Sequence, residues 1–368
     1  MISHFSSHQR QRLRKQLLAW FARRHRPFPW RHDRDAYRIW VSEVMLQQTQ
    51  AATVVPYFER FMAAFPRVAA LAAADEQDVL RLWEGLGYYT RARNLHRAAK
   101  RIMAMHEGQF PKDPEVAAML PGLGRYMVGA ILSQAYGSRL PILEANSQRV
   151  LCRLFAVRTD PTRNPTRGQL WQLAEALLPR SGVGDFNQAL MELGAVVCTA
   201  TNAKCEACPL RKDCASFRLG IQNEIPVLPK RAASVDVREA AIMVRRKDRV
   251  LLVQRPATGR WAGLWEFPHG QLENGETLES AATRIMWQFA AFRVRLGAEV
   301  FTVRHAVTYH RITLTCFEAA YLSGAFQSKF YTRGEWIEPA RLGEYPVSSP
   351  QRRLAAALNS SERQHLLF

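Results

Sequence analysis

The chain has 368 residues, enough for two domains with separate cores, and its 48% hydrophobic and 23% charged residues are typical of a globular protein. It contains no apolar run near the roughly 18 residues that span a bilayer. It begins with a polar, basic stretch, so we expect neither a membrane protein nor a secreted one. The net charge of +19 favours a polyanionic partner. Residues 235–368 contribute 18 Lys and Arg against 13 Asp and Glu, and the preceding residues 33 against 19, so most of the excess precedes residue 235.

The first predicted element is an amphipathic helix over residues 9–25, which leads into the cationic, aromatic loop RPFPWR. The planar side chains of Arg26, Trp30 and Arg31 can hold a flat heterocycle. A Pro-rich connector that packs its aromatic rings into the core is the alternative. The residues alone leave both interpretations open.

A carboxylate follows inside the apolar stretch 37–49, at Glu43. A buried carboxylate is costly unless it is paired or protonated, and desolvation raises its pKa. An acid with a raised pKa can protonate a poor leaving group at neutral pH. The pattern therefore predicts a general acid, and a structural Glu that caps a neighbouring helix is the alternative.

Residues 75–105 predict two helices joined by the turn GLGYYTRARN. Tyr88 and Tyr89 on this glycine-rich turn, beside arginines, can stack on bases and bind phosphates. Tyrosine pairs are also common anchors in protein cores, so the turn by itself is moderate evidence for nucleic-acid binding.

A second glycine turn, Gly122-x-Gly124, lies between residues 115–120 and a helix that follows at once. Free backbone N–H groups at such a helix start can bind one phosphate, and the glycines permit a close approach. An ordinary corner between two helices is the alternative.

The short apolar stretch 141–143 then delivers Glu144 to the start of another helix, with Asn146 close behind. A carboxylate in this place suits chemistry on a sugar whose backbone is held by the glycine turn. A charge that stabilises the helix N-terminus is the alternative.

Four of the six cysteines lie close together, with the spacing Cys198-x6-Cys205-x2-Cys208-x5-Cys214. Disulfides are the alternative, and they are rare inside cells. Four thiolates at this density predict a metal site, either zinc or an iron–sulfur cluster, and the spacing does not separate the two. Cys152 and Cys316 are expected to be buried thiols.

Residues 218–235 have the composition of a linker. Beyond them the apolar period changes from 3.6 to 2, which predicts strands at 240–244, 250–254 and 312–317, with a helix at 277–291. The C-terminal part is therefore expected to be an α+β module.

Several of these segments resemble known families. LPGLGRYMVGAI resembles the helix-hairpin-helix of DNA glycosylases, and PILEANSQRV and SEVMLQQT resemble their segments with catalytic carboxylates. The cysteine pattern resembles the [4Fe–4S] loop of endonuclease III and MutY proteins, and LWEFPHGQLENGET resembles a Nudix fold. Over nearly the whole chain the resemblance is to MutY-type adenine glycosylases. It implies a mainly α helix-hairpin-helix domain at 1–217 with a cluster loop at 198–214, a linker at 218–235 and an α+β Nudix-like lesion-recognition domain at 236–368.

The resemblance also implies a function. A monomeric base-excision-repair enzyme in the cytoplasm, at the bacterial nucleoid, would remove adenine mispaired with 8-oxoguanine or guanine in double-stranded DNA. Glu43 would protonate the base, Glu144 would meet the charge that develops on the sugar, and Tyr126 and Asn146 would orient them. Arg26, Trp30, Arg31 and Gln188 would bound the adenine pocket; Gln48, Tyr88, Gly122, Gly124 and Thr308 would contact DNA or the lesion; Cys198, Cys205, Cys208 and Cys214 would hold the cluster.

The chain departs from the family pattern in places. MutY proteins have Asp-Gly-Asn where this chain has Glu144-Ala145-Asn146, which motivates a hypothesis of lesion binding with weak or no catalysis. Related lyases have a Lys at the position of Tyr126, and a phenol cannot form a Schiff base, so we expect base removal without strand cleavage and disfavour a bifunctional lyase.

The Nudix-like part departs too. Ile285, Gln288 and Phe289 occupy the positions of the metal-binding glutamates, which disfavours a nucleotide hydrolase. In the stretch 305–310, expected to recognise the lesion, Thr308 retains a hydroxyl while its neighbours differ from the family's Phe-Ser-His.

Overall fold

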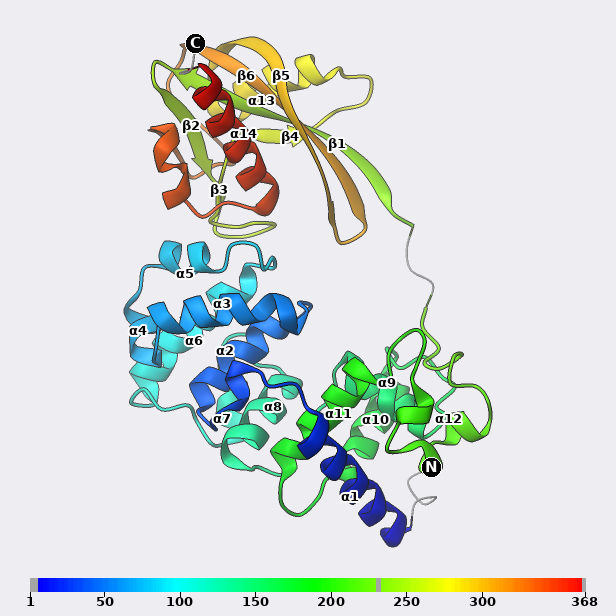
Figure 1. The fold of residues 1–368 in the computed structure, drawn as a ribbon. Helices are drawn as coiled ribbons and strands as arrows, with labels where there is room; N and C mark the ends of the chain where they lie inside the picture. Colours follow the sequence, from blue (N-terminus) through cyan, green and yellow to red (C-terminus); the bar gives the residue numbers. More distant parts are fainter. Residues whose placement is uncertain (1–5, 230–232, 366–368) are drawn as a thin grey trace. The chain divides into compact units, whose positions relative to one another are not determined.

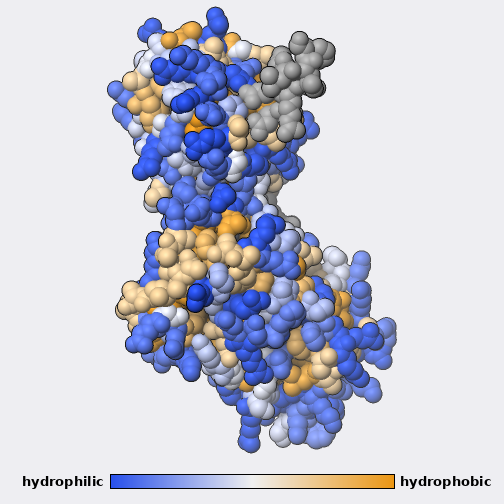
Figure 2. Space-filling view, turned by 60° about the vertical axis from the view of Figure 1, so that its left-hand side comes forward, coloured by the Kyte–Doolittle hydropathy of each residue, from blue (hydrophilic) through white to orange (hydrophobic). Residues whose placement is uncertain are grey.

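The computed structural model describes residues 6–229 and 233–365, which divide into two compact units. One unit comprises Met1–Ala73 and Asn94–Lys230, and the other comprises Ala74–Arg93 and Arg231–Phe368 (Figure 1). Hydrophilic residues cover most of the face in Figure 2, as a chain with 51 Lys and Arg requires. Within the described ranges, no helix has the length and apolar character needed to cross a membrane.

The first unit is helical. Its helices are α1 (Ser7–Arg24), α2 (Ala36–Leu46), α3 (Ala51–Ala64), α4 (Val68–Ala73), most of α6 (Thr90–Met105), α7 (Pro114–Ala118), α8 (Arg125–Tyr136), α9 (Ala145–Leu154), α10 (Asn164–Leu177), α11 (Val183–Val196) and α12 (Ala215–Arg218). Short 3-10 turns lie at Pro29–Arg31, Cys205–Ala207 and Arg211–Asp213. Helix α11 packs against α1, α8 and α9, and α2 packs against α3 and α8.

Local sequence signals explain where these helices begin. Ser6 and Gln9 form a capping box at α1, whose apolar positions Leu13 and Leu17 are buried, so the predicted N-terminal helix is confirmed. Asp35 accepts hydrogen bonds from two backbone N–H groups at the start of α2. Helix α2 is buried on most of its surface, and this burial encloses Glu43.

The second unit contains a seven-stranded sheet in the order β3-β2-β1-β6-β5, with β4 paired to β1 and β7 to β2. The strands are β1 (Val235–Arg246), β2 (Arg249–Gln254), β3 (Trp265–Glu266), β4 (His269–Gln271), β5 (Arg293–Val307), β6 (His310–Ser323) and β7 (Arg333–Ile337). β1 and β6 are parallel, and the other pairs are antiparallel. The predicted strands at 240–244, 250–254 and 312–317 are confirmed.

Two helices cover opposite faces of this sheet. α14 (Ser349–His365) packs on the core that contains Ala241 and Met243, while α13 (Leu278–Ala290) packs on the core that contains Ile242 and Val244. This alternation along β1 is the period of 2 seen in the sequence. We call residues 233–365 the C-terminal module. The second unit also includes α5 (Glu76–Leu82) and the turn after it, which chain order did not suggest.

The ends of the predicted linker, 218–235, have structure of their own. Ile225 is buried in the core of the first unit, and its carbonyl accepts a hydrogen bond from Arg153 (2.8 Å). Val235 is already the first residue of β1. Residues 230–232 lie outside the described ranges, and the domain limits stay a prediction.

Close approach of α9 and α11 depends on Gly194. A Cβ atom added there would lie 2.6 Å from the Cβ of Asn146 and 2.8 Å from its carbonyl oxygen, distances that real contacts do not show. We therefore expect Gly194→Ala to lower the free energy of unfolding by about 1–3 kcal/mol, because one helix must shift. Urea titration would measure this. Gly168→Ala in α10 is the matched control: a Cβ there meets nothing within 4 Å, so equal losses in both variants would contradict the packing argument.

Candidate active site

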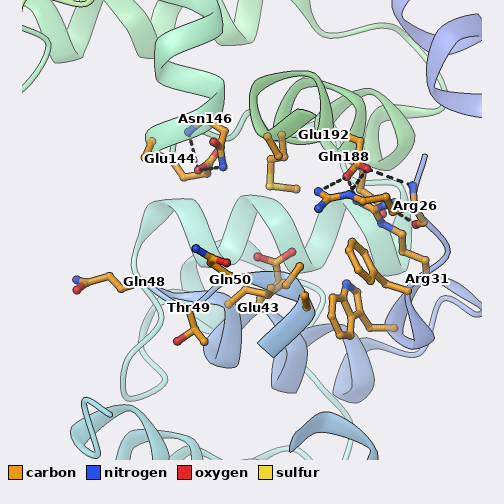
Figure 3. A pocket seen from close by; sticks show the side chains of 18 of the residues that line it. Arg26, Arg31, Glu43, Gln48, Thr49, Gln50, Glu144, Asn146, Gln188 and Glu192 are labelled. Carbon is orange, nitrogen blue, oxygen red and sulfur yellow. Dashed lines mark hydrogen bonds and ion pairs between the residues drawn. The ribbon is translucent and has the colours of Figure 1, made fainter. Parts of the chain in front are cut away.

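One cavity of about 670 Å³ in the first unit brings together most of the predicted site residues. Its walls come from the 26–31 loop, α2, residues 48–52, α8, the start of α9 and α11 (Figure 3). The predicted residues that line it are Arg26, Trp30, Arg31, Glu43, Gln48, Tyr126, Glu144, Asn146 and Gln188. Two further lining residues, Gln134 and Glu192, were not predicted from the sequence.

Glu43 is buried and is held by two side chains of α8. The hydroxyl of Tyr126 donates a hydrogen bond to its Oε2 (2.7 Å), and the amide of Gln134 donates to its Oε1 (3.0 Å). Burial raises the pKa of the Glu43 carboxyl, against the opposite effect of these two donors. Burial and the nearby carboxylates also raise the pKa of Tyr126 well above its usual range, so this phenol keeps its proton at neutral pH.

Glu144 is the N-cap of α9. Its carboxylate accepts hydrogen bonds from the backbone N–H groups of Asn146 (2.8 Å) and Ser147 (2.7 Å), and from the side-chain amide of Asn146 (3.2 Å) (Figure 3). Burial raises the pKa of Glu144, and these backbone donors oppose the shift. The carboxylate therefore caps the helix and also lines the cavity, so the two interpretations from sequence coexist. Ala145 is the first residue of α9, where any L-residue has a favourable backbone.

Arg149 links this helix start to the cysteine loop. Its guanidinium donates to the side-chain oxygen of Asn146 (2.8 Å), to the carbonyl of Gly194 (2.7 Å) and to the carbonyl of Cys198 (2.7 Å). A single side chain thus connects Asn146, the partner of Glu144, to the first predicted metal ligand.

The cationic wall of the cavity is organised by Glu192, a fully buried carboxylate on α11. It accepts hydrogen bonds from Arg26 (Nε, 2.7 Å; Nη2, 3.1 Å) and from Arg31 (Nη2, 3.0 Å). The two guanidinium groups lie 4.9 and 5.1 Å from the ring centre of Phe28. These contacts fix the arginine planes before any ligand enters. Burial acts to raise the pKa of Glu192, but the two arginines outweigh it and hold that pKa below its usual value.

Trp30 satisfies both interpretations of the Pro-rich loop. Its ring is buried, stacks on Phe28 at 4.8 Å and meets the edge of Phe58 at 5.4 Å, as a core residue would. It also lines the cavity. Phe28 and Trp30 therefore form a stacked aromatic floor that is preformed by core packing.

The four predicted cysteine ligands line one small cavity together with Arg153 and Phe217. They are free thiols, and Arg153, itself buried, donates to the sulfur of Cys198 (3.4 Å) and to the carbonyl of Thr199 (2.7 Å). In the described part of the chain, no three His, Cys, Asp or Glu side chains are grouped so that they could hold a metal ion. An iron–sulfur cluster takes each of its four thiolates at a separate iron atom, and four cysteines that line one cavity are a donor set that fits such a cluster.

Three predicted DNA contacts share an unusual backbone. Gln48, Tyr88 and Thr308 are exposed and have φ of 59°, 46° and 57°, a left-handed conformation that is uncommon outside glycine. Gln48 points away from the Glu192 end of the cavity (Figure 3). Tyr88 and Thr308 belong to the second unit, with Thr308 in the turn between β5 and β6.

The glycine turn lies outside the cavity. Gly124 is the N-cap of α8, with no side chain closing that helix end, and Gly122 has a φ of 83°. A Cβ atom at Gly122 would lie 2.9 Å from that of Asn94. The turn thus leaves backbone N–H groups exposed, as the phosphate hypothesis requires.

The Nudix-like helix offers little for metal binding. Ile285 is buried in the core and Gln288 is exposed. Nearby, Glu276 is paired with Arg284 through two 2.8 Å hydrogen bonds. The absence of a hydrolase metal site from this module stays a prediction.

Comparisons with known proteins identify the family. Residues 41–176 match the model of the HhH-GPD superfamily base excision DNA repair protein, and residues 240–357 match the NUDIX domain. Adenine DNA glycosylase of the mouse is 37% identical over 318 residues, which are 72% of this chain and 61% of that protein. The enzyme of that name from Buchnera aphidicola (subsp. Schizaphis graminum) is 34% identical, over 66% of this chain and 70% of that protein.

The chain belongs to the adenine DNA glycosylase family. It spans about six tenths of the length of the mouse and human relatives that it matches. A solved thermostable thymine-DNA glycosylase is 28% identical with a TM-score of 0.53, over 57% of this chain and 97% of that one. An endonuclease III–DNA complex has a TM-score of 0.50 at 18% identity and supports the fold alone. The predicted family and fold class are confirmed.

The buried acid Glu43 should destabilise the fold when it is ionised. Because its pKa is raised above the ordinary value of 4.5, the folded state holds the proton more tightly than the unfolded state, and stability falls as the pH rises through the folded pKa. We expect Glu43→Gln to be more stable than the wild type by about 1–3 kcal/mol at pH 8, with the difference closing near pH 4.5.

Chemical denaturation at a series of pH values would measure this difference. Glu59→Gln, at an exposed position of α3, is the control and should leave stability unchanged at every pH. A Glu43→Gln variant that is less stable than the wild type at pH 8 would show that the carboxylate is stabilised by its partners.

Proposed function

We propose that this protein hydrolyses the N-glycosidic bond of adenine paired with 8-oxoguanine or guanine in double-stranded DNA, as a monomer at the bacterial nucleoid. One observation carries the proposal: a buried, protonatable carboxyl, Glu43, and a second carboxylate, Glu144, line the same cavity, whose walls are planar cationic and aromatic side chains. Membership of the adenine DNA glycosylase family supports the choice of base. The adenosine enters the cavity by rotating out of the duplex.

Glu43 acts as the general acid. Its carboxyl transfers a proton to N7 of adenine, so the bond between C1′ and N9 breaks and the base leaves as neutral adenine. Tyr126 and Gln134 hold the carboxyl in one orientation, because each donates to a different oxygen. Since the protonated form is required, base excision should slow as the pH rises through the raised pKa of Glu43.

Glu144 meets the positive charge that develops on the sugar, as a stabilising carboxylate or transient nucleophile. Water then adds to C1′ and gives its proton to Glu43, which has become a base. Asn146 orients Glu144 through the 3.2 Å hydrogen bond between their side chains. Tyr126 has no amine, so the reaction ends at base removal.

The remaining predicted residues bind the substrate. Arg26, Arg31, Trp30 and Gln188 surround the adenine, with the arginines held by Glu192. The backbone N–H groups after Gly122 and Gly124 bind a phosphate, Gln48 and Tyr88 insert into the base stack, and Thr308 contacts the 8-oxoguanine.

A [4Fe–4S] cluster is the proposed cofactor, held by Cys198, Cys205, Cys208 and Cys214. Bound there, the cluster would cross-link the loop, and Lys204 and Lys212 of this loop would face the phosphate backbone. Arg153 offsets the negative charge of the thiolates, because its guanidinium lies beside Cys198.

The first test is a duplex with one 8-oxoguanine:A pair, incubated with the protein and then divided for treatment with alkali. We expect strand breaks only in the alkali-treated half, because base removal leaves an abasic site that alkali cleaves. A duplex with 8-oxoguanine:C is the control and should stay intact. Breaks without alkali would indicate a lyase and contradict the role given to Tyr126.

Lesion binding without catalysis is the second candidate function. It is favoured by the hydrogen bonds that already hold the Glu144 carboxylate at the start of α9. Glu144→Asp separates the candidates: the shorter side chain shifts the carboxylate by about 1 Å, a displacement that can change the rate on the order of 10²-fold. Tight binding of the duplex by the wild type, with base removal only by Glu144→Asp, would favour the lesion-binding protein.

The cofactor proposal has its own measurement. Protein purified without oxygen should contain about four iron and four sulfide per chain, and Cys208→Ser should lose most of both. Cys316→Ser, a buried thiol of the C-terminal module, is the matched control and should keep the cluster. Stoichiometric zinc without sulfide would contradict the proposal.

A further inference from the structure

The segment 74–93 is joined to the C-terminal module at both ends. At its start, the indole N–H of Trp265 donates to the side-chain oxygen of Gln77 (3.2 Å), whose amide donates to the carbonyl of Gly263 (3.4 Å). At its end, Arg93 donates to the carbonyl of Ala257 (2.9 Å). These partners are far apart in sequence but belong to one compact unit.

The middle of the segment is held by the strongest of these contacts. Arg352 of α14 donates two hydrogen bonds to the carboxylate of Glu84, at 2.6 and 2.8 Å, in the paired geometry that fixes both groups. The backbone of Val347 also takes part: its N–H donates to Glu84 (3.5 Å), and its carbonyl accepts from the hydroxyl of Tyr89 (3.0 Å). Tyr88 lies between the two residues that are held in this way.

The turn that carries Tyr88, residues 84–91, is closed by hydrogen bonds from neighbouring side chains of the same segment. Arg91 donates to the carbonyls of Leu86 (2.9 Å) and Gly87 (3.2 Å), and the indole of Trp83 also donates to Gly87 (3.2 Å). Tyr89 is buried, whereas the side chain of Tyr88 is 56% exposed on a left-handed backbone. A rigid turn with one exposed aromatic tip is therefore fixed to the C-terminal module.

We propose that Glu84 and Arg352 are positioning residues that lock the Tyr88 turn to the C-terminal module, so that Tyr88 and the β5–β6 hairpin with Thr308 meet the lesion-containing duplex as one body. The inference rests on the proposed function, in which Tyr88 inserts beside the lesion. It adds that recognition of 8-oxoguanine by the module and insertion of Tyr88 are mechanically coupled. Loss of the ion pair should therefore weaken lesion preference without touching the groups around Glu43.

Hydrogen exchange in the full chain without DNA tests the coupling. Glu84→Gln should speed exchange of the amides of residues 84–91 by about tenfold, because it removes the charge that Arg352 pairs with. Arg352→Lys, which keeps the charge but not the paired geometry, should act in the same direction. Glu318→Gln is the matched control: it breaks the Arg245–Glu318 pair between β1 and β6 and should leave this turn unchanged.

The consequence for DNA is measured as the ratio of dissociation constants for duplexes with guanine or 8-oxoguanine opposite an uncleavable adenosine analogue. Glu84→Gln should reduce the preference for 8-oxoguanine by about tenfold, and adding Arg352→Lys should reduce it little further, because both act through one contact. Unchanged exchange of the turn, or faster exchange with an unchanged preference, would overturn the inference. A wild-type protein with no preference would instead refute the proposed recognition of 8-oxoguanine by the module, while the exchange result would still decide whether the ion pair holds the turn.

Discussion

The burial of the Glu43 carboxyl is the constraint on which the site depends. A carboxyl enclosed by an apolar helix needs donors, and both donors, Tyr126 and Gln134, come from α8. The orientation of the acid therefore depends on the packing of α2 against α8. Because Gly124 is the N-cap of α8 and no side chain caps that helix end, the helix that holds the acid also leaves backbone N–H groups free at its start. The donors that orient the acid and the N–H groups proposed to bind the DNA backbone thus belong to one helix.

The second carboxylate depends on a different contact, between α9 and α11. Gly194 lets the two helices approach, and Arg149 spans from Asn146 to the carbonyls of Gly194 and Cys198. Glu144 is the N-cap of α9, and its carboxylate accepts hydrogen bonds from two backbone N–H groups of that helix. The carboxylate is thus held within the first turn of α9.

The sequence could predict those site residues whose type is unusual for their local surroundings. Glu43 in an apolar run, clustered cysteines and a glycine turn before a helix are local anomalies, and the structure brings Glu43, Tyr126, Glu144 and Asn146 to one cavity. Glu192 could not be found in this way. Its role exists only through Arg26 and Arg31, from which it is separated by more than 160 residues, and a Glu within a helix is locally unremarkable. The sequence also could not show that residues 74–93 group with the C-terminal module, because contacts between distant segments leave no periodic pattern in the sequence.

The predicted DNA contacts outside the glycine turn share a strained backbone conformation. Gln48, Tyr88 and Thr308, which come from three distant parts of the chain, all hold φ near +50° with exposed side chains. Such conformations cost on the order of 1–3 kcal/mol each and persist only where the surroundings enforce them. For Tyr88 the surroundings are identified: Arg91 and Trp83 inside the turn, and the C-terminal module beneath it. A backbone held in this way has little conformational entropy left to lose when the side chain that it carries binds, which suits a residue that must enter a stacked duplex.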